Sequence, residues 1–452
     1  MKIKDIHTIY FLGIGGIGMS ALARFFKTQG CTVSGYDKTP TPLTQKLIEE
    51  GIAIHFEEDI LQIPAHVDLV VYTPAIPVSH VEYQHIIHHN IPIKKRAEIL
   101  GMISSDYFSI AVAGTHGKTT ITGLISHILH TSDIKINAFI GGIVKNFQSN
   151  IIISDTAQCI VVEADEYDRS FLWLNPDIAI ISAIDADHLD IYSDKKKLEE
   201  SYHLFAQRIK PKGKLIYKHT LSIPILEGVT SYSYGLDATA DFYAKDISLQ
   251  NSRFHFTACL LGEEISIEIK TPGRHNIENA IAAAAACYLQ GISIEQIKHG
   301  IQTYQGIARR FDYRFENPSA IYIDDYAHHP EELKAFISAV REMYPTKKIT
   351  GIFQPHLFSR TLHFADDFAH VLDTLDEAIL LDIYPARELP IEGVTSQLLL
   401  DKMTSTNKRI LSKDMLLEEL KHAKVEVLLT IGAGDIDQLV QPIESILNNR
   451  FK

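Results

Sequence analysis

The chain contains 452 residues, of which 46% are hydrophobic and 22% charged, and it carries a formal net charge of −13 at pH 7. At roughly 150 residues per domain this length predicts about three domains of ordinary globular composition. The acidic balance argues against nucleic acid or an anionic membrane surface as the main partner. We expect no membrane insertion, because no window approaches about 18 uncharged apolar residues.

Two further features predict a cytoplasmic protein. The N-terminus lacks a small-residue cleavage site and runs straight into a glycine motif, so we expect no signal peptide. Cys31, Cys159, Cys259 and Cys287 are far apart and form no CxxC pair. This spacing predicts reduced thiols, without a zinc site or a disulfide framework.

Short apolar runs alternate with stretches of helical periodicity along most of the chain. Strands are predicted at residues 7–12, 33–35, 68–72, 109–113, 159–162 and 178–184. The alternation predicts an α/β protein with parallel sheets flanked by helices. From 242 to 269 the pattern changes to period 2, which indicates antiparallel ribbons. A helix follows at 276–289, and a third α/β stretch begins near 321, so domain boundaries are expected near 105 and 312.

The first predicted strand leads into a glycine-rich loop, FLGIGGIGMSALARFF, in which Gly13, Gly15 and Gly18 match GxGxxG. Glycines let backbone N–H groups approach a phosphate, and the N-terminus of the following helix favours the same anion. Asp37 lies 19 residues after Gly18, where a dinucleotide fold contacts a ribose hydroxyl. The motif does not separate NAD from another nucleotide or a nucleotide sugar, and a glycine turn needed only for packing is the alternative.

The strand at 109–113 precedes a second phosphate-binding signal, GTHGKTT, and an amphipathic helix. Lys118 supplies a positive charge for the β and γ phosphates, and the Thr119 hydroxyl is placed to bind Mg²⁺. Val112 occupies the position of the first glycine in GxxxxGKT, so this loop is a shorter variant that uses Gly114. The loop consists of Gly114, Thr115, His116, Gly117, Lys118, Thr119 and Thr120.

Acidic residues follow the next two predicted strands. Carboxylates at the carboxyl ends of strands beside a phosphate loop are well placed to hold Mg²⁺. His188 is either a metal ligand or a hydrogen-bonded structural histidine, and most of the other acids are expected to be solvated or capping residues. The two groups are Glu163, Asp165, Glu166 and Asp168, and then Asp185, Asp187, His188 and Asp190.

Polar loops recur after the predicted strands of the last third of the chain. Asn276 and Asn279 share a helix face, and their amides can contact a purine edge or cap the helix. Several polar loops after parallel strands predict a third α/β domain that faces a shared cleft. The loop residues are Arg309 and Arg310 of ARRF, Asp324, Asp325, Tyr326, His328 and His329 of DDYAHHP, His356 and Arg360 of FQPHLFSRT, and Asp435 of GAGDI.

Together these segments resemble the Mur ligases of peptidoglycan synthesis. The matching motifs are GIGGIGMSALA, GTHGKTT, EADEYD, ADHLDIY, GRHNIENA, RRF, DDYAHHP, FQPHLFSRT, YPARELPIEGVTS and GAGDI. They cover nearly the whole chain in order. The GIGGIGMS opening and the short spacing from EADEYD to NPDIAI favour the member that adds alanine over the relative that reattaches a recycled tripeptide.

The resemblance implies three α/β domains and an ATP-dependent amide ligase. Residues 1–105 would form a Rossmann-like domain for the UDP substrate, 106–312 a P-loop ATPase-like domain, and 313–452 a Rossmann-like domain for the amino acid. The implied substrates are UDP-N-acetylmuramate, L-alanine and ATP, with Mg²⁺, and the reaction passes through an acyl phosphate. The protein is expected to be a monomer or a weak homodimer.

The resemblance also assigns site residues. The catalytic set is Lys118, Glu163, His188, His328 and Arg360, and Thr119, Glu163 and His188 are the implied metal ligands. ATP would contact the loop from Gly114 to Thr120 together with Asn279, Arg310 and Asp324. The UDP substrate would contact Gly13, Gly15, Gly16, Gly18, Asp37 and Thr73, and the amino acid would contact Tyr326, His328, His356 and Arg360.

Two departures from the family pattern carry expectations. Relatives that add later amino acids use a carbamylated lysine, but the corresponding segment here, residues 201–204, contains no lysine, so we expect no such modification. Leu357 stands where the family often has arginine, so we expect Arg360, three residues later and in the same direction on a helical turn, to bind the amino-acid carboxylate. An ion pair of Arg360 with Asp366 or Asp367 is the alternative.

Two readings from other classes compete with the ligase. In an NAD-dependent dehydrogenase with an unrelated P-loop domain, the acidic groups and the DDYAHHP loop would have no function. A nucleotide-sensing regulatory protein would not need Lys118, Glu163 and an amino-acid loop together.

Overall fold

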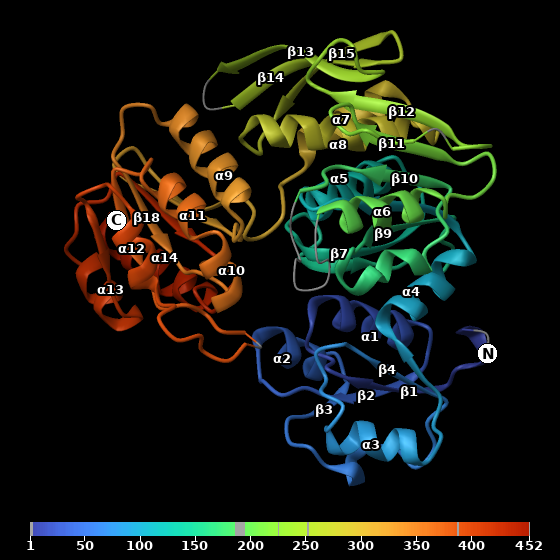
Figure 1. Ribbon diagram of the computed structural model, residues 1–452. Coiled ribbons are helices and arrows are strands. Elements are labelled where there is room, and N and C mark those ends of the chain that lie inside the picture. Colours follow the sequence, from blue (N-terminus) through green and yellow to red (C-terminus); the bar gives the residue numbers. More distant parts are fainter. Residues whose placement is uncertain (1–2, 186–194, 225, 251–252, 387, 452) are drawn as a thin grey trace. The chain divides into compact units, whose positions relative to one another are not determined.

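The computed structural model in Figure 1 describes residues 3–185, 195–224, 226–250, 253–386 and 388–451. The chain folds into two compact units. Unit 1 comprises Met1–Ser248, His255–Ile269 and Ile277–Gln305, and unit 2 comprises Leu249–Phe254, Lys270–Asn276 and Gly306–Lys452. The strands of the described residues form three sheets. The predicted α/β class is confirmed.

The first sheet, in unit 1, has five parallel strands in the order β3-β2-β1-β4-β5. The strands are β1 (Thr8–Leu12), β2 (Thr32–Tyr36), β3 (Ala53–His55), β4 (Leu69–Tyr72) and β5 (Ile93–Lys95). Helices α1 (Ile17–Thr28) and α4 (Arg96–Ser105) cover one face, α3 (Val81–His88) covers the other, and α2 (Pro42–Glu49) connects β2 to β3 (Figure 1). The strand order reverses at β1, so the loop after β1 opens at the switch point where such sheets bind ligands.

The second sheet has ten strands in the order β15-β14-β13-β12-β11-β10-β6-β9-β7-β8. They are β6 (Phe108–Ala113), β7 (Ile136–Val144), β8 (Ser149–Ile152), β9 (Cys159–Ala164), β10 (Ile178–Ile181), β11 (Lys214–Lys218), β12 (Thr230–Gly235), β13 (Phe242–Gln250), β14 (Arg253–Leu260) and β15 (Glu263–Ile269). The associated helices are α5 (Lys118–Thr131), α6 (Lys195–Ala206), α7 (Arg274–Leu289), α8 (Ile294–Thr303) and the 3₁₀ segment η3 (Tyr167–Trp173). Strand β6 lies between β9 and β10, so the loop after β6 is again at a reversal of strand order.

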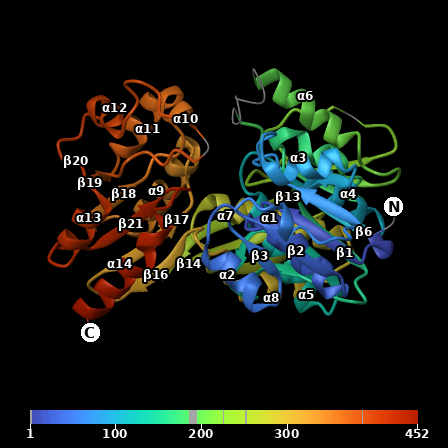
Figure 2. The same ribbon diagram turned by 90° about the horizontal axis from the view of Figure 1, so that it is seen from below.

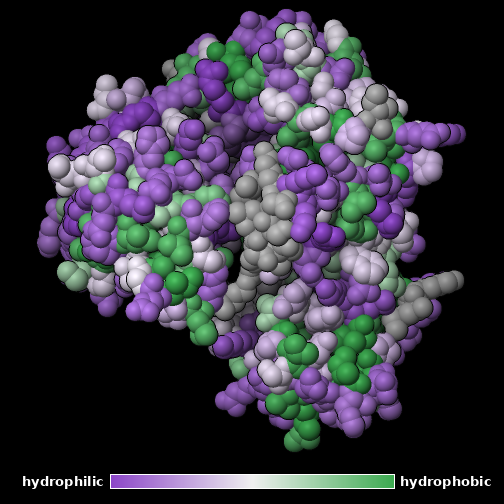
Figure 3. Space-filling model, in the orientation of Figure 1, coloured by the Kyte–Doolittle hydropathy of each residue, from purple (hydrophilic) through white to green (hydrophobic). Residues whose placement is uncertain are grey.

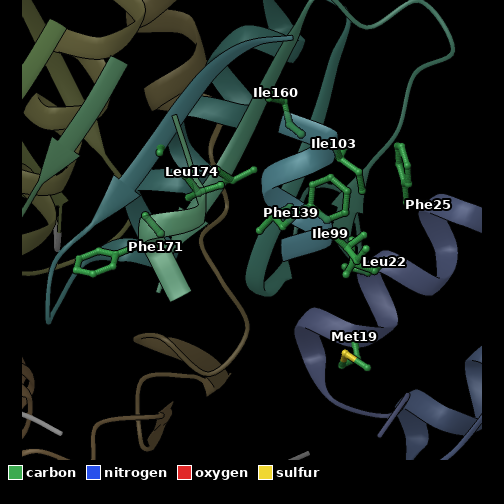
Figure 4. Packing of buried hydrophobic residues seen from close by; sticks show 14 of the residues in the cluster. Met19, Leu22, Phe25, Ile99, Ile103, Phe139, Ile160, Phe171 and Leu174 are labelled. Atoms are coloured by element: carbon green, nitrogen blue, oxygen red, sulfur yellow. The ribbon is translucent and has the colours of Figure 1, made fainter. Parts of the chain in front are cut away.

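One apolar cluster joins the first two sheets. It contains Ile9 and Phe11 of the first sheet, and Ile160, Val162 and Ala179 of the second. In Figure 4, Leu22 and Phe25 of α1 and Ile99 and Ile103 of α4 lie close to Phe139 and Ile160 of the second sheet. Met19 of α1, and Phe171 and Leu174 of the η3 region, belong to the same cluster. Burial of this shared cluster explains why residues on both sheets belong to one compact unit.

Unit 2 is built on a six-stranded sheet in the order β16-β17-β21-β18-β19-β20. The strands are β16 (Asp312–Glu316), β17 (Ile321–Asp325), β18 (Ile349–Phe353), β19 (Glu377–Leu380), β20 (Lys408–Ile410) and β21 (Val427–Ile431). Its helices are α9 (Pro330–Met343), α10 (Phe358–His363), α11 (Ala365–Leu372), α12 (Ser396–Lys402), α13 (Lys413–Leu420) and α14 (Asp437–Arg450). Helix α11 lies on the side of the sheet opposite α13 and α14 (Figure 2). The edge strand β16 is antiparallel to β17, whereas the other pairs are parallel.

The predicted strands and the alanine-rich helix appear close to their expected positions. The strand predicted at 178–184 ends earlier, at Ile181, because the chain then turns to bond the phosphate loop through Ser182 and Ala183. Neighbouring strands β14 and β15 are joined through Leu261 and Gly262, a turn that suits an antiparallel pair. All four cysteines are buried and free.

The surface is mixed in hydropathy. On the face shown in Figure 3, hydrophilic side chains predominate and hydrophobic ones are scattered among them in small groups. Within the described residues, no helix is both long enough and apolar enough to span a membrane.

Candidate active site

The phosphate loop of unit 1 connects β6 to α5 and requires glycine at two positions. Gly117 adopts φ +84° at the N-cap of α5, and a Cβ at this position would lie 2.7 Å from Oδ1 of Asn279. A Cβ on Gly114 would lie 2.1 Å from Oγ of Ser182. The loop is therefore held between the end of β10 and the buried amide of Asn279, which the structure brings against it.

Lys118 is the first residue of α5, and its ammonium group lies inside the loop. Nζ donates to the carbonyl oxygen of Gly114 at 2.6 Å and to the two carboxylate oxygens of Glu166 at 2.8 and 2.9 Å. Burial lowers the pKa of Lys118, but attraction to Glu166 and Asp165 outweighs it and holds the pKa above its usual value. The ammonium group of Lys118 is therefore charged near pH 7 and is paired with the fully buried Glu166.

Glu163, at the end of β9, lies beside the start of the same helix. Its Oε1 accepts a hydrogen bond from the backbone N–H of Gly141 at 2.6 Å. Burial raises the pKa of Glu163, and hydrogen bonds from Gly141 and the Thr119 hydroxyl only partly offset that rise. The structure therefore brings together the two predicted oxygen ligands, Thr119 and Glu163.

The oxygen donors of Thr119 and Glu163 suit Mg²⁺, which takes few protein ligands and completes its shell with water and phosphate oxygens. In the part of the chain that the structure describes, no group of three or more His, Cys, Asp or Glu side chains could hold a metal ion by itself. The third predicted ligand, His188, lies outside the described residues, as do Asp187 and Asp190.

The remaining acids of the EADEYD loop bond to basic residues that the sequence analysis missed. Asp165 lies 3.2 Å from Nη2 of Arg96, and Asp168 lies 2.6 Å from Nζ of Lys95. The signal was the basic run of residues 94–96 at the start of a helix. Short-range patterns did not connect this run to an acidic loop about 70 residues later. In the second acidic group, Asp185 lies 3.4 Å from Nε2 of His116 in the phosphate loop.

The first glycine loop contacts the predicted UDP-substrate residues. The backbone N–H of Gly15 donates to Oδ2 of Asp37 at 2.7 Å. Gly13 adopts φ +85°, and a Cβ there would lie 2.5 Å from Cγ2 of Thr73. Gly16 is the N-cap of α1, so the loop leads directly into the positive end of a helix. The structure thus brings these predicted residues together at the carboxyl edge of the first sheet.

In unit 2, the DDYAHHP loop connects β17 to α9 and gathers most of the predicted residues of the third domain. Asp324 is fully buried, and its oxygens accept from Thr430 at 2.7 Å and from Arg309 at 3.2 Å. Tyr326 lies under two cations, with its ring centroid 5.2 Å from Cζ of Arg309 and 5.1 Å from Cζ of Arg310. Both guanidinium groups therefore lie within cation–π distance of the Tyr326 ring, an arrangement that arginine favours.

His328 and His356 lie close together in unit 2, with ring centroids 5.9 Å apart. Burial lowers the pKa of His328 to about 4, although Glu332 beside it acts in the opposite direction and Arg360 acts with burial. His356 also stacks on Tyr384 at 5.8 Å. The structure therefore places Tyr326, His328, His356 and Arg360 in one region of unit 2, with His328 neutral near pH 7.

The expectation that Leu357 and Arg360 lie on the same helical turn and point the same way is wrong. Helix α10 begins at Phe358, and Leu357 precedes it with φ +69° and ψ +136°. Leu357 is buried, whereas Arg360 is partly exposed. The alternative partner Asp366 instead binds Lys402 at 2.6 Å. A leucine at positive φ is strained, and such strain is usually retained where neighbouring structure dictates the turn.

Three family models match successive parts of the chain. They are described as Mur ligase family, catalytic domain (residues 8–108), Mur ligase middle domain (112–287) and Mur ligase, glutamate ligase domain (309–434). A UDP-N-acetylmuramate–L-alanine ligase from Flavobacterium johnsoniae is 48% identical over 457 residues, an alignment that covers 100% of both chains.

Solved structures give the same picture of the fold. A UDP-N-acetylmuramate–alanine ligase from Thermotoga maritima superposes with a TM-score of 0.83 at 25% identity, covering 98% of this chain and 99% of that chain. A murein peptide ligase from Psychrobacter arcticus superposes with a TM-score of 0.73 at 22% identity, with the same coverage. Because the identity to the Psychrobacter arcticus ligase is only 22%, that similarity shows a shared fold and nothing more.

Proposed function

This chain belongs to the Mur ligase family, and on that premise we propose that it joins L-alanine to the lactyl carboxylate of UDP-N-acetylmuramate at the expense of ATP. The observation that carries the proposal is the 48% identity with an alanine ligase along the full length of both chains. The dehydrogenase and sensor readings are set aside, because neither explains a chain matched by Mur ligase domains from residue 8 to 434.

The chemistry brings two anions together. The substrate carboxylate attacks the γ-phosphorus of ATP, ADP leaves, and an acyl phosphate forms. The amine of alanine then attacks the acyl carbon, loses a proton, and the tetrahedral intermediate expels phosphate. Lys118 offsets the repulsion between the carboxylate and the γ-phosphate, since a fixed positive charge in a water-poor site stabilises charge that spreads in the transition state.

We assign the nucleotide to the loop from Gly114 to Thr120 and to Asn279 of unit 1. The family resemblance implies that Arg310 and Asp324 also contact ATP, and we keep both as proposed nucleotide-binding residues. Thr119 and Glu163, together with His188, would hold Mg²⁺, which when bound supplies charge neutralisation at the phosphates. The hydrogen-bonded oxygens of Thr119 and Glu163 support this choice. The amino acid is assigned to Tyr326, His328, His356 and Arg360.

We also propose the domain limits 1–105, 106–312 and 313–452, a cytoplasmic location, and a monomer or weak homodimer without nucleic-acid partners. The free buried cysteines and the net charge of −13 support the location and the absence of nucleic acid.

One experiment tests the activity. The protein is incubated with ATP, Mg²⁺ and UDP-N-acetylmuramate, and then offered alanine, glycine, serine or a muramyl-type tripeptide while phosphate release is measured. Release that depends on both the UDP substrate and alanine supports the proposal. Release only with the tripeptide would identify the recycling ligase instead, and no release with any acceptor would overturn the ligase assignment.

A further inference from the structure

The residues that we have assigned to the UDP substrate include no cation. Its residues are glycines, Thr73 and Asp37, and Asp37 is itself an anion whose oxygen accepts from Gly15. A pyrophosphate carries negative charge on both phosphoryl groups. Backbone N–H groups and a helix N-terminus favour such an anion, but Asp37 opposes it, so a positive side chain is expected near the loop.

Arg96 occupies that place. It is the first residue of α4, immediately after β5, and belongs to the same five-stranded sheet region as the glycine loop. A Cβ on Gly18 would lie 2.6 Å from Nη1 of Arg96 and 3.2 Å from its Cδ. Glycine at position 18 therefore serves a second purpose: any larger residue would displace the guanidinium group from the start of α1.

On its other side Arg96 contacts the loop that follows β9. Its Nη2 lies 3.2 Å from Oδ2 of Asp165, and the two side chains are 26% and 39% exposed. A guanidinium group has five N–H donors, so this contact leaves donors for a second anion. Because the side chain of Arg96 is partly exposed, a ligand in solution can reach the guanidinium group.

We propose that Arg96 binds the pyrophosphate of the UDP substrate and that Asp165 is the partner of the guanidinium group when no substrate is bound. This inference rests on the proposed function for the identity of the ligand. Arginine suits the task because its planar fork can bind two phosphate oxygens at once, as lysine cannot. Asp165 competes with the phosphate oxygens for the same cation, so its charge limits the affinity for the substrate.

The test measures binding of UDP, and separately of uridine, to the full chain by calorimetry without ATP. For Arg96→Gln we expect the Kd for UDP to rise by about 10- to 150-fold, as expected for loss of a charge-assisted hydrogen bond. Uridine, which has no phosphate, should bind as it does to the wild type. Arg96→Lys should recover part of the loss, because it restores the charge without the fork.

Two further variants separate a ligand contact from a structural ion pair. Lys95→Gln is the matched control, since Lys95 binds Asp168 at 2.6 Å on the same loop and is the residue next to Arg96. The affinity of the Lys95→Gln variant for UDP should stay at the wild-type value. Asp165→Asn removes the competing carboxylate and should tighten UDP binding.

The proposal is overturned if Arg96→Gln and Asp165→Asn weaken UDP and uridine to the same extent, because that result means that the ion pair only supports the fold. It is also overturned if Arg96→Gln, folded by circular dichroism, binds UDP like the wild type. If the wild type binds UDP in the expected manner but releases no phosphate with ATP, UDP-N-acetylmuramate and alanine, the ligase assignment fails while the Arg96 assignment stands.

Discussion

At the scale of single residues, the pairing of Lys118 with Glu166 predicts opposite responses to ATP. Lys118→Ala should lower kcat by about 100-fold or more, because a charge acting on the transferring phosphoryl group is lost. It should also reduce the increase in melting temperature caused by ATP. Glu166→Gln should enlarge that increase, because the buried ammonium group loses its hydrogen-bonded carboxylate and phosphate then replaces the missing counterion.

Thermal unfolding with and without ATP and Mg²⁺ measures both responses. Equal ATP-induced shifts in the two variants and the wild type would show that Lys118 does not contact the nucleotide. Near-native turnover of Lys118→Ala at saturating ATP would contradict its catalytic role independently.

Arg360 is the second residue-scale case. Alanine has a methyl group, an amine and a carboxylate, and the carboxylate is the group that a protein can bind most strongly. Arg360→Ala should raise the KM for alanine by about 10- to 150-fold, which corresponds to about 1.5–3 kcal/mol for a charge-assisted contact. The KM values for ATP and UDP-N-acetylmuramate should stay close to native.

Leu357→Ala is the control for Arg360, because Leu357 is buried and has no side-chain donor. It should reduce stability more than alanine affinity. Steady-state kinetics with each substrate varied in turn make the comparison. A similar weakening of all three substrates by Arg360→Ala would indicate a folding role for Arg360, and the carboxylate assignment would then be withdrawn.

At the scale of elements, the junction of β17 and α9 contains two groups whose titrations oppose each other. Burial raises the pKa of Asp325 to about 6, despite attraction from Arg310. Burial lowers the pKa of His328 to about 4. Between about pH 4 and 6 the folded chain retains the proton of Asp325, so this group makes stability fall as pH rises. In the same range the unfolded chain binds the proton of His328, so that group makes stability rise.

Single substitutions should separate these two effects. Relative to the wild type, the free energy of unfolding of His328→Gln should decrease by about 3 kcal/mol from pH 4 to 6.5. That of Asp325→Asn should increase by about 3 kcal/mol over about the same range. Urea unfolding at a series of pH values measures both. Slopes of the same sign would mean that one of the two shifts has been assigned the wrong direction.

At the scale of the whole molecule, the apolar cluster shared by the first two sheets should make them unfold together. Leu22→Ala removes a buried side chain from α1 at the centre of this cluster, and we expect a loss of about 2–5 kcal/mol. Hydrogen exchange should then accelerate in β1 of the first sheet and in β9 of the second.

Ile86→Ala is the matched control. Ile86 is equally buried, but it belongs to α3 and to the cluster on the opposite face of the first sheet, with Tyr10, Leu12, Tyr36 and Val70. Its exchange effect should concentrate on strands β1 to β5. Faster exchange confined to the first sheet in both variants would show that the shared cluster does not couple the two sheets.

The sequence alone determined the local features of the protein. Apolar runs followed by GxGxxG or GTHGKTT predicted β1 with α1 and β6 with α5, because a strand, a glycine turn and a helix are specified by neighbouring residues. Period-2 patterning indicated the ribbon of β13 to β15. The chemistry of Lys118, Thr119 and Glu163 could be proposed for the same reason, since each follows directly on a strand or glycine turn.

Only the tertiary structure decided which distant residues meet. The contacts of Arg96 with Asp165 and of Gly117 with Asn279 join residues about 70 and 160 positions apart, and no local pattern encodes such a pairing. The antiparallel edge strand β16 and the positive φ of Leu357 were likewise not foreseen. Strand order and the packing of α1 and α4 between two sheets set these relations, because burial of the shared apolar cluster depends on the whole chain rather than on any one segment.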